Sequence, residues 1–188
     1  MRKNAVSIFV AILLCLPFAL TAREVADVEI PESLSYESLS LVLNGAGVRS
    51  KFFMDIYVSA LYLEIKSQDA EAILRDDKPM GMRLHIVSGL VDSDKLKDAI
   101  SDGFEASTGG NLDPVKSQID QFMALMDQEV KEGDFFDFIY IPGTGLKIYK
   151  NTAFQDDIKG LAFKRAFLGI WLGDDPADDD LKEEMLGL

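Results

Sequence analysis

Alternating polar and apolar positions predict several strands in the first half of the chain. Residues 38–43 (SLSLVL) and 82–87 (MRLHIV) alternate in this way, which is typical of half-buried strands. Residues 52–63 (FFMDIYVSALYL) are rich in aromatic and β-branched side chains and contain neither Gly nor Pro. That composition predicts one long strand.

Two glycine-rich stretches indicate turns. Residues 44–47 (NGAG) follow the first alternating stretch and predict a hairpin turn. They lack the Lys-Ser or Lys-Thr that follows a phosphate-binding loop, so a phosphate site is the weaker interpretation. Residues 142–145 (PGTG) separate two apolar stretches, 135–141 and 146–149, and predict a second hairpin.

Helical periodicity dominates the second half of the chain. Helices are predicted over residues 92–104, with Asp92 or Ser93 as the cap, 113–127, 158–172 and a short segment that starts at Pro176. In the third helix the apolar face carries Phe163, Phe167, Ile170 and Trp171, and we expect Trp171 to be largely buried. Strands, then helices, then a hairpin with helices predict an α+β fold, with a mainly antiparallel sheet covered by helices on one face.

The first 22 residues have the pattern of an export signal. Arg2 and Lys3 precede an apolar run from Ala5 to Leu20, and Ala22 offers a small residue for cleavage. The run is short for a membrane span, which needs about 20 apolar residues, so an uncleaved anchor is the alternative. We therefore predict a signal peptide over 1–22, one domain over 23–188, a periplasmic location and no stable membrane insertion after cleavage.

Charge and cysteine content exclude several classes of protein. The 188 residues carry 19 Lys and Arg against 32 Asp and Glu, a net charge of -13. Such an acidic chain is a poor partner for nucleic acid or for an anionic membrane surface. The single cysteine, Cys15, excludes a disulfide framework and a zinc-finger cluster. Because Cys15 lies in the predicted signal peptide, we expect no thiol chemistry in the exported chain.

Few residues carry obvious chemistry. The only histidine, His85, lies within a predicted strand and on the face opposite Leu84, so a strand histidine satisfied by its neighbours is the simpler interpretation than a ligand or base. Acidic residues gather at 174–180 without the spacing of a calcium loop, and a helix start explains most of them. We predict no metal, no cofactor and no catalytic residue from these patterns.

Two segments carry a resemblance to a known family. Residues 43–49 (LNGAGVR) with 53–64 (FMDIYVSALYLE), and residues 167–173 (FLGIWLG) with 181–187 (LKEEMLG), are similar to the chalcone isomerase family and to its exported bacterial branch. The resemblance spans about residues 25–188. It implies an open-faced β-sandwich, in which a large antiparallel sheet is covered by a helical layer and a ligand cleft lies between them.

The plant enzymes of this family cyclise chalcones with an Arg, a Thr and a Tyr, while an Asn and a further Thr or Ser line their cleft. Arg49 falls on the family Arg, but Tyr57 falls where the enzymes keep Thr. The positions of the other three groups fall near Ser93, Ile100 and Asp178. Losing the hydroxyls that stabilise enolate charge removes what is usually the largest catalytic term. The resemblance therefore gives little support to isomerase activity.

An Arg paired with Tyr resembles instead the fatty-acid-binding members of the family, in which the pair receives the carboxylate. A guanidinium grips a carboxylate in a bidentate way, and a phenol adds one donor. On one continuous strand Arg49 and Tyr57 would lie about 26 Å apart, so the chain must turn between them. The alternatives are a surface Arg49 paired with an acidic residue, and a Tyr57 that only fills the core.

Three hypotheses follow. The first is a periplasmic, non-catalytic binder of a fatty acid or similar apolar carboxylate, with Arg49, Tyr57 and Ser93 as ligand-binding residues. The second is an isomerase, an intramolecular lyase, acting on a chalcone-like or other small molecule. The third is a structural or assembly module without a ligand.

Overall fold

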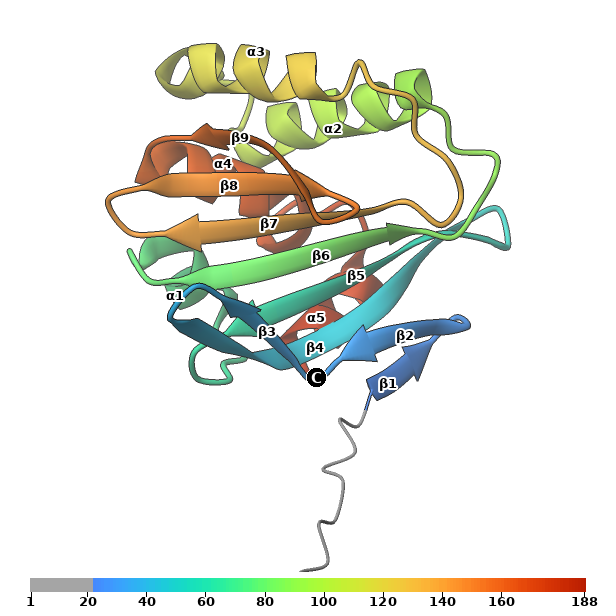
Figure 1. The fold of residues 1–188 in the computed structure, drawn as a ribbon. Helices are drawn as coiled ribbons and strands as arrows, with labels where there is room; N and C mark the ends of the chain where they lie inside the picture. The colour runs from blue at the N-terminus through green and yellow to red at the C-terminus, as the bar shows by residue number, and fades with distance from the viewer. Residues whose placement is uncertain (1–21) are drawn as a thin grey trace, which may run out of the picture.

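The computed structural model describes residues 22–188 and contains one large antiparallel sheet (Figure 1). Seven strands follow one another in the sheet in chain order, so each pairs with its sequence neighbour. They are β3 (Ser33–Tyr36), β4 (Leu39–Lys51), β5 (Met54–Leu63), β6 (Met80–Ile86), β7 (Phe135–Ile141), β8 (Gly145–Lys150) and β9 (Ala153–Ile158). The predicted signal peptide lies, except for Ala22, outside the described residues.

Helices cover one face of this sheet. Figure 1 shows α4 and α5 behind the sheet, with α2 and α3 along its β8–β9 side. The helical elements are α1 (Ala70–Arg75), α2 (Ser93–Ser107), the 3₁₀ turn η1 (Asp113–Val115), α3 (Lys116–Leu125), α4 (Leu161–Leu172) and α5 (Asp179–Leu186). The larger hydrophobic core lies between these helices and the sheet, and includes Phe104, Phe122, Phe163 and Phe167. The predicted α+β fold is confirmed.

The other face of β4 and β5 is covered by a separate hairpin, β1 (Ala22–Val25) and β2 (Val28–Pro31). Val28 and Ile30 of this hairpin pack with Leu41, Val58 and other residues in a second, smaller core. The long strands β4 and β5 are therefore buried on both faces. Among residues 22–188, no helix has both the length and the apolar character that crossing a bilayer requires.

The predicted turn at residues 44–47 is wrong, because these residues lie inside β4. Their glycines are explained by α5, which crosses this part of the strand. A Cβ at Gly45 would lie 2.1 Å from the carbonyl oxygen of Glu184. The Asn44 amide donates to the carbonyl oxygens of Ser67 and Met185, both at 2.9 Å. NGAG is thus a strand segment shaped for close contact with a helix.

The real turn between β4 and β5 consists of Phe52 and Phe53, which the pattern placed in the strand. Lys51 pairs with Met54, so the loop has two residues. Phe52 and Phe53 have φ of 54° and 65°. Positive φ at both central residues is the mark of a type I′ turn, which matches the twist of the flanking strands.

The other predicted elements differ from the structure only in the last third of the chain, whereas β1, β2, β3 and α1 were not predicted from the pattern. The helices predicted at 92–104 and 113–127 and the hairpin at 142–145 are confirmed. Strand β9 was missed, and helix α4 therefore begins at Leu161 rather than near 158. The short last helix begins at Asp179, capped by Asp178, rather than at Pro176. Trp171 is buried, as expected.

Candidate ligand-binding cleft

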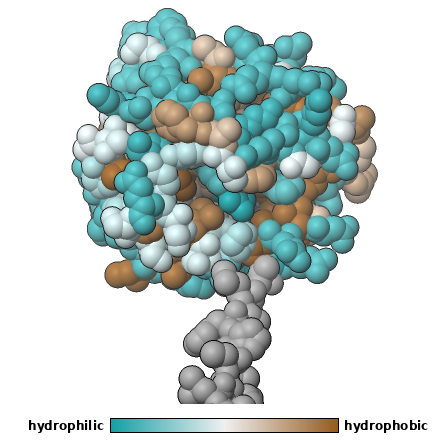
Figure 2. Space-filling view, viewed as in Figure 1, coloured by the Kyte–Doolittle hydropathy of each residue, from teal (hydrophilic) through white to brown (hydrophobic). Residues whose placement is uncertain are grey.

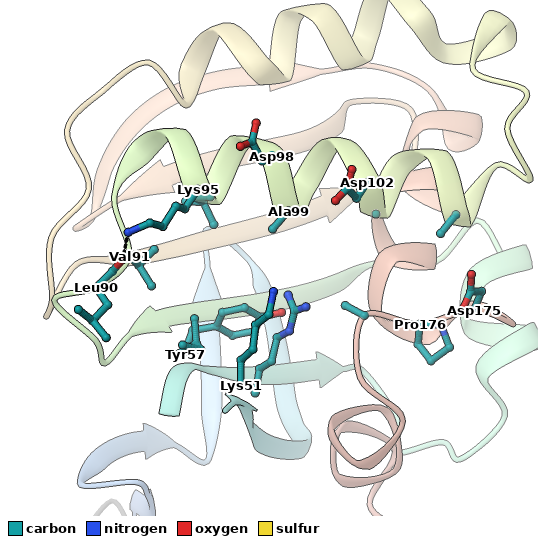
Figure 3. A pocket seen from close by; sticks show the side chains of 16 residues that line it. Lys51, Tyr57, Leu90, Val91, Lys95, Asp98, Ala99, Asp102, Asp175 and Pro176 are labelled. Carbon is teal, nitrogen blue, oxygen red and sulfur yellow. Dashed lines mark hydrogen bonds between the residues drawn. The ribbon is translucent and has the colours of Figure 1, made fainter. Parts of the chain in front are cut away.

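A cleft of about 470 Å³ lies between α2 and the ends of β4 and β5 that adjoin the Phe52–Phe53 turn. This volume is within the range of small-molecule sites. In Figure 3, Tyr57 and Lys51 lie on the strand side, facing α2. Leu90 and Val91 close one end of the cleft, and Asp175 and Pro176 lie at the other end.

The turn brings Arg49 and Tyr57 together. They are cross-strand partners in the β4–β5 pair, so both side chains project to the helix face of the sheet. The Arg49 Cζ lies 5.8 Å from the centre of the Tyr57 ring. The pairing skips Ile56, which forms a bulge on β5. Bulges re-aim side chains, and here both Ile56 and Tyr57 line the cleft.

Tyr57 is buried, and its hydroxyl is held by a hydrogen bond from a core residue. The Trp171 Nε1 donates to the Tyr57 hydroxyl oxygen at 2.9 Å. Burial raises the pKa of the phenol, although the charge of Arg49 and the bond from Trp171 both oppose that rise. Tyr57 therefore stays protonated at neutral pH. With its oxygen already accepting from Trp171, the hydroxyl has its proton left to donate.

Arg49 is half-buried and lines the same cleft. Within residues 22–188, no carboxylate lies within 4.0 Å of its guanidinium. The contrast is Arg83, whose guanidinium donates two hydrogen bonds to Asp137, at 2.6 and 2.7 Å. Arg49 is therefore not a surface arginine paired with an acidic residue, which was the alternative interpretation.

The two walls of the cleft differ in charge. The strand wall contributes Arg49 and Lys51, whereas the helix α2 contributes Asp98 and Asp102. Lys95 also lies at the start of α2. Its ammonium donates to the Leu90 carbonyl oxygen at 2.9 Å and pairs with the Asp92 carboxylate at 3.1 Å. An anionic head group in the cleft is thus attracted to the strand wall, next to Tyr57, and repelled by the middle of α2.

Most of the lining is apolar, and sequence reasoning did not assign it to a site. The apolar lining residues include Ile56, Leu90, Val91, Leu96, Ala99, Ala106, Pro176 and Ala177. Small side chains on α2 are a signal of this surface, since Ala99, Gly103 and Ala106 fall on one helix face. Ala99 and Ala106 leave room for the cleft on this face, whereas Gly103 admits Ile170 of α4, since a Cβ at Gly103 would lie 2.7 Å from the Ile170 Cγ2. Lys51 and Trp171 were also missed as site residues.

Ser93 does not lie among the residues that line the cleft. Its hydroxyl donates to the Gln128 carbonyl oxygen at 2.7 Å, at the start of α2. Ile100, at the family Asn position, is buried in the core, and Asp178 caps α5 by accepting from the Leu181 backbone N–H at 2.9 Å. The structure therefore brings Arg49 and Tyr57 together. The other three positions that the family resemblance indicates lie outside this cleft.

The other chemical candidates have structural explanations. His85 is on the outer face of β6, where it stacks on Phe135 at 6.1 Å between ring centres. Burial and the nearby charge of Arg83 lower the pKa of this imidazole. Asp179 and Asp180 lie in the first turn of α5, as expected for a helix start. In the described part of the chain, no cluster of three or more His, Cys, Asp or Glu side chains is arranged to hold a metal ion.

Comparisons with known proteins agree with this architecture. A crystal structure of a fatty-acid binding protein from Arabidopsis thaliana matches the fold with a TM-score of 0.67 at 18% identity, covering 85% of this chain and 92% of the plant protein. Comparison with curated proteins gives no match. The model of a family described as chalcone isomerase-like matches residues 22–187, nearly the whole described chain. The chain therefore belongs to the chalcone isomerase-like family.

Proposed function

We propose that this protein is a non-catalytic binder of a fatty acid or similar apolar carboxylate, which it holds in the cleft between α2 and the β4–β5 hairpin. The observation that carries the proposal is the position of Arg49 in the cleft. Its guanidinium lines a largely apolar cleft without a carboxylate partner among the described residues, and its cross-strand neighbour Tyr57 has a hydroxyl proton to donate.

The chemistry of the ligand follows from these two groups. A carboxylate accepts two bonds from a guanidinium and one from a phenol, which places the head group at the strand wall. The alkyl chain then lies against the apolar residues of α2 and of the 88–91 and 175–177 segments. The Arabidopsis structural neighbour is a fatty-acid binding protein, which supports the same ligand class.

Catalysis of chalcone cyclisation has less support. The positions that carry the enzyme's Tyr and Asn are near Ser93 and Ile100 here, and neither lines the cleft. The Tyr57 hydroxyl is buried and held protonated, so it is suited to donating to a bound oxygen rather than to removing a proton. A chalcone cyclisation assay in which wild type accelerates the reaction and Arg49→Ala does not would contradict the proposal.

The decisive experiment compares a fatty acid with the fatty alcohol of the same chain length by calorimetry. Arg49→Ala should weaken acid binding by about 2–4 kcal/mol, because it removes the charged partner in a partly dry site. Tyr57→Phe should cost about 0.5–1.5 kcal/mol, the worth of one hydrogen bond. Arg49→Lys should recover only part of the loss, because an ammonium lacks the planar fork.

Controls separate head-group recognition from general effects. The alcohol should be nearly indifferent to Arg49→Ala. Arg75→Ala, which changes an exposed arginine of α1 already paired with Asp76, should leave acid binding unchanged. If acid and alcohol bind wild type equally well, or if neither binds, the Arg49 carboxylate site is wrong and an assembly role without a ligand becomes the better explanation.

The proposed location is the periplasm, supported by the predicted signal peptide over residues 1–22. Mass spectrometry of the periplasmic fraction should find a chain that begins near Arg23. Lipids extracted from protein purified from its native host should include the carboxylate ligand. Recovery of the uncleaved chain in the membrane fraction alone would contradict the location.

A further inference from the structure

The tip of the β4–β5 hairpin exposes large apolar side chains. Phe52 is 79% exposed, Phe53 fully exposed at 107% and Met54 43% exposed. Leu90, in the loop between β6 and α2, is 55% exposed. Figure 2 shows hydrophobic colour on the right-hand edge of the molecule, where Figure 1 places the β4–β5 turn beside the β6–α2 loop. We call Phe52, Phe53, Met54 and Leu90 the apolar tip.

Folding does not explain the choice of residues at this turn. Phe52 and Phe53 both have positive φ, a conformation that bulky side chains adopt only at a cost. Type I′ turns strongly prefer Asn-Gly in these two places. The two aromatic rings recover none of that cost by burial within the chain, since both are exposed. An Asn-Gly turn would give the same hairpin with less strain and a polar surface.

The apolar tip adjoins the cleft. Leu90 belongs to both, and Lys51, which precedes Phe52 directly, also lines the cleft. The Lys51 Nζ lies 5.8 Å from the centre of the Phe52 ring, so a cation flanks the exposed aromatic side chains. Whatever covers the tip therefore also lies against one end of the cleft.

We propose that the apolar tip inserts into the interfacial region of a bilayer of zwitterionic lipids. Aromatic and aliphatic side chains flanked by lysine are suited to the boundary between head groups and acyl chains, where the ammonium of Lys51 reaches the phosphate level. The net charge of -13 disfavours an anionic surface, and an apolar tip does not depend on one. Four side chains are also far fewer than the roughly 20–30 residues that each partner contributes to a stable protein interface.

Docking in this way sets one end of the cleft against the lipid. If the cleft holds a fatty acid, which rests on the proposed function, the ligand passes between bilayer and cleft with little exposure of its alkyl chain to water. The docking itself does not depend on what the cleft holds. It is a reversible, peripheral contact, because a few interfacial side chains give far weaker binding than a spanning helix.

The experiment uses a tryptophan placed at the tip and vesicles of brominated phosphatidylcholine, which quench only tryptophans that enter the bilayer. Phe53→Trp should gain a fluorescence component that the vesicles quench. Wild type, whose single Trp171 is buried, should not be quenched. The matched control is Ile65→Trp, because Ile65 is 83% exposed and follows the opposite end of β5. This readout reports on the tip itself, whatever other segments touch the vesicles.

A double variant tests whether the two exposed phenylalanines are responsible for binding to the bilayer. Phe52→Asn with Phe53→Gly installs the preferred type I′ pair, so it should fold at least as stably as wild type. Its partition into phosphatidylcholine vesicles should fall about tenfold or more, because two apolar side chains no longer enter the interface. Binding of a fatty acid in the absence of vesicles should be unchanged, because neither residue lines the cleft.

The outcomes separate docking from ligand binding. Equal quenching of the Phe53→Trp and Ile65→Trp variants, or no loss of partition in the Asn-Gly variant, overturns the docking proposal. A third result would also overturn it: wild type self-associates, the Asn-Gly variant does not, and brominated vesicles fail to quench the Phe53→Trp variant. The tip would then contact a second copy of the chain rather than a bilayer. If the tip is quenched but no fatty acid binds, docking stands and the proposed function fails.

Discussion

At the scale of single residues, the cleft depends on a chain of contacts that begins in the core. Trp171 is buried on α4, and its N–H needs an acceptor, which the Tyr57 hydroxyl supplies at 2.9 Å. That bond fixes the orientation of the phenol and leaves its proton for a ligand. Tyr57 is thus both a core aromatic residue and a cleft-lining residue, so filling the core does not exclude contact with a ligand.

Two substitutions at Trp171 should separate packing from hydrogen bonding. Trp171→Ala should lower the free energy of unfolding by about 3–5 kcal/mol, the range for large aromatic truncations. Trp171→Phe keeps much of the packing and removes the N–H donor, so it should cost about 1–3 kcal/mol. Urea unfolding followed by far-ultraviolet circular dichroism measures both. A loss below about 1 kcal/mol for Trp171→Ala would mean that this helix face contributes little.

Sequence reasoning named two of the residues that line the candidate cleft. Arg49 and Tyr57 came from the resemblance to the family, and the need for a turn between them came from strand geometry. The Trp171 bond was out of reach, because it joins residues 114 positions apart whose meeting depends on how α4 lies on the sheet. Ser93 also came from the resemblance, but its hydroxyl donates to the Gln128 carbonyl oxygen instead.

At the scale of elements, the contact between β4 and α5 places the C-terminal helix on the sheet. Two glycines of β4 make this contact possible, but they meet different atoms. A Cβ at Gly45 would approach backbone atoms of Glu184, Met185 and Gly187 at 2.1–2.9 Å. A Cβ at Gly47 would approach no backbone atom so closely, but would lie 1.8 Å from the Glu184 Oε2 and 2.6 Å from the Glu184 Cβ.

This difference predicts unequal costs for two alanine substitutions. Gly45→Ala should lower the free energy of unfolding by about 1–3 kcal/mol or slightly more, because α5 itself must move to relieve the overlap. Gly47→Ala should cost less than Gly45→Ala, because the exposed Glu184 carboxylate can rotate away and only its Cβ, at 2.6 Å, still requires a small shift of α5. Denaturant unfolding of the two variants side by side provides the measurement. Equal costs would show that α5 is not held tightly against the strand.

Element predictions failed where a local signal had a non-local cause. The glycines at 45 and 47 look like a turn because glycine is common in turns, yet here they admit a helix from the far end of the chain. Phe52 and Phe53 look like strand residues because aromatic side chains favour strands, yet they form the turn. Strand β9 was missed because its sequence, AFQDDI, carries two aspartates, which an exposed edge strand tolerates.

At the scale of the whole molecule, two cores on opposite faces of one sheet make the β4–β5 hairpin a rigid platform. The helix-side core includes Tyr57, and the smaller core under β1 and β2 includes Val58. Adjacent residues of β5 are thus anchored on opposite sides. This explains why the predicted α+β class was correct although local details were not, because the class depends on the order of elements and on which faces are apolar.

The buried tyrosines predict how stability depends on alkaline pH. Burial raises the pKa of Tyr57 and Tyr62 above the ordinary value of 10.0. Burial and hydrogen bonding to Asp77 and Tyr36 raise those of Tyr140 and Tyr149 to about 12. Above pH 10 the unfolded chain therefore loses phenolic protons that the folded chain keeps. Their contribution to stability is complete below pH 10 and is lost as the pH rises through the folded-state values.

Lys164 makes the free energy of unfolding rise with pH, and it does so at lower pH than the tyrosines act. Its amine is buried against the carbonyl oxygens of Ile73, Leu74 and Asp76, and burial lowers its pKa to about 8 from 10.5. Between these two values the unfolded chain holds a proton that the folded chain has released, so this residue adds stability as the pH rises to 10.5. Above pH 10.5 its contribution is constant, and of these five groups only the tyrosines still change.

We therefore expect the free energy of unfolding to fall with pH between 10.5 and 12. Urea unfolding at several pH values in this range measures the slope, which Tyr140→Phe should reduce because it removes one of the four phenols. The ultraviolet absorbance of tyrosinate gives an independent readout. In urea the tyrosines should titrate near pH 10, and in the folded protein they should titrate later. Stability that is constant or rising above pH 10.5, or identical titrations with and without urea, would mean that these hydroxyls are open to solvent.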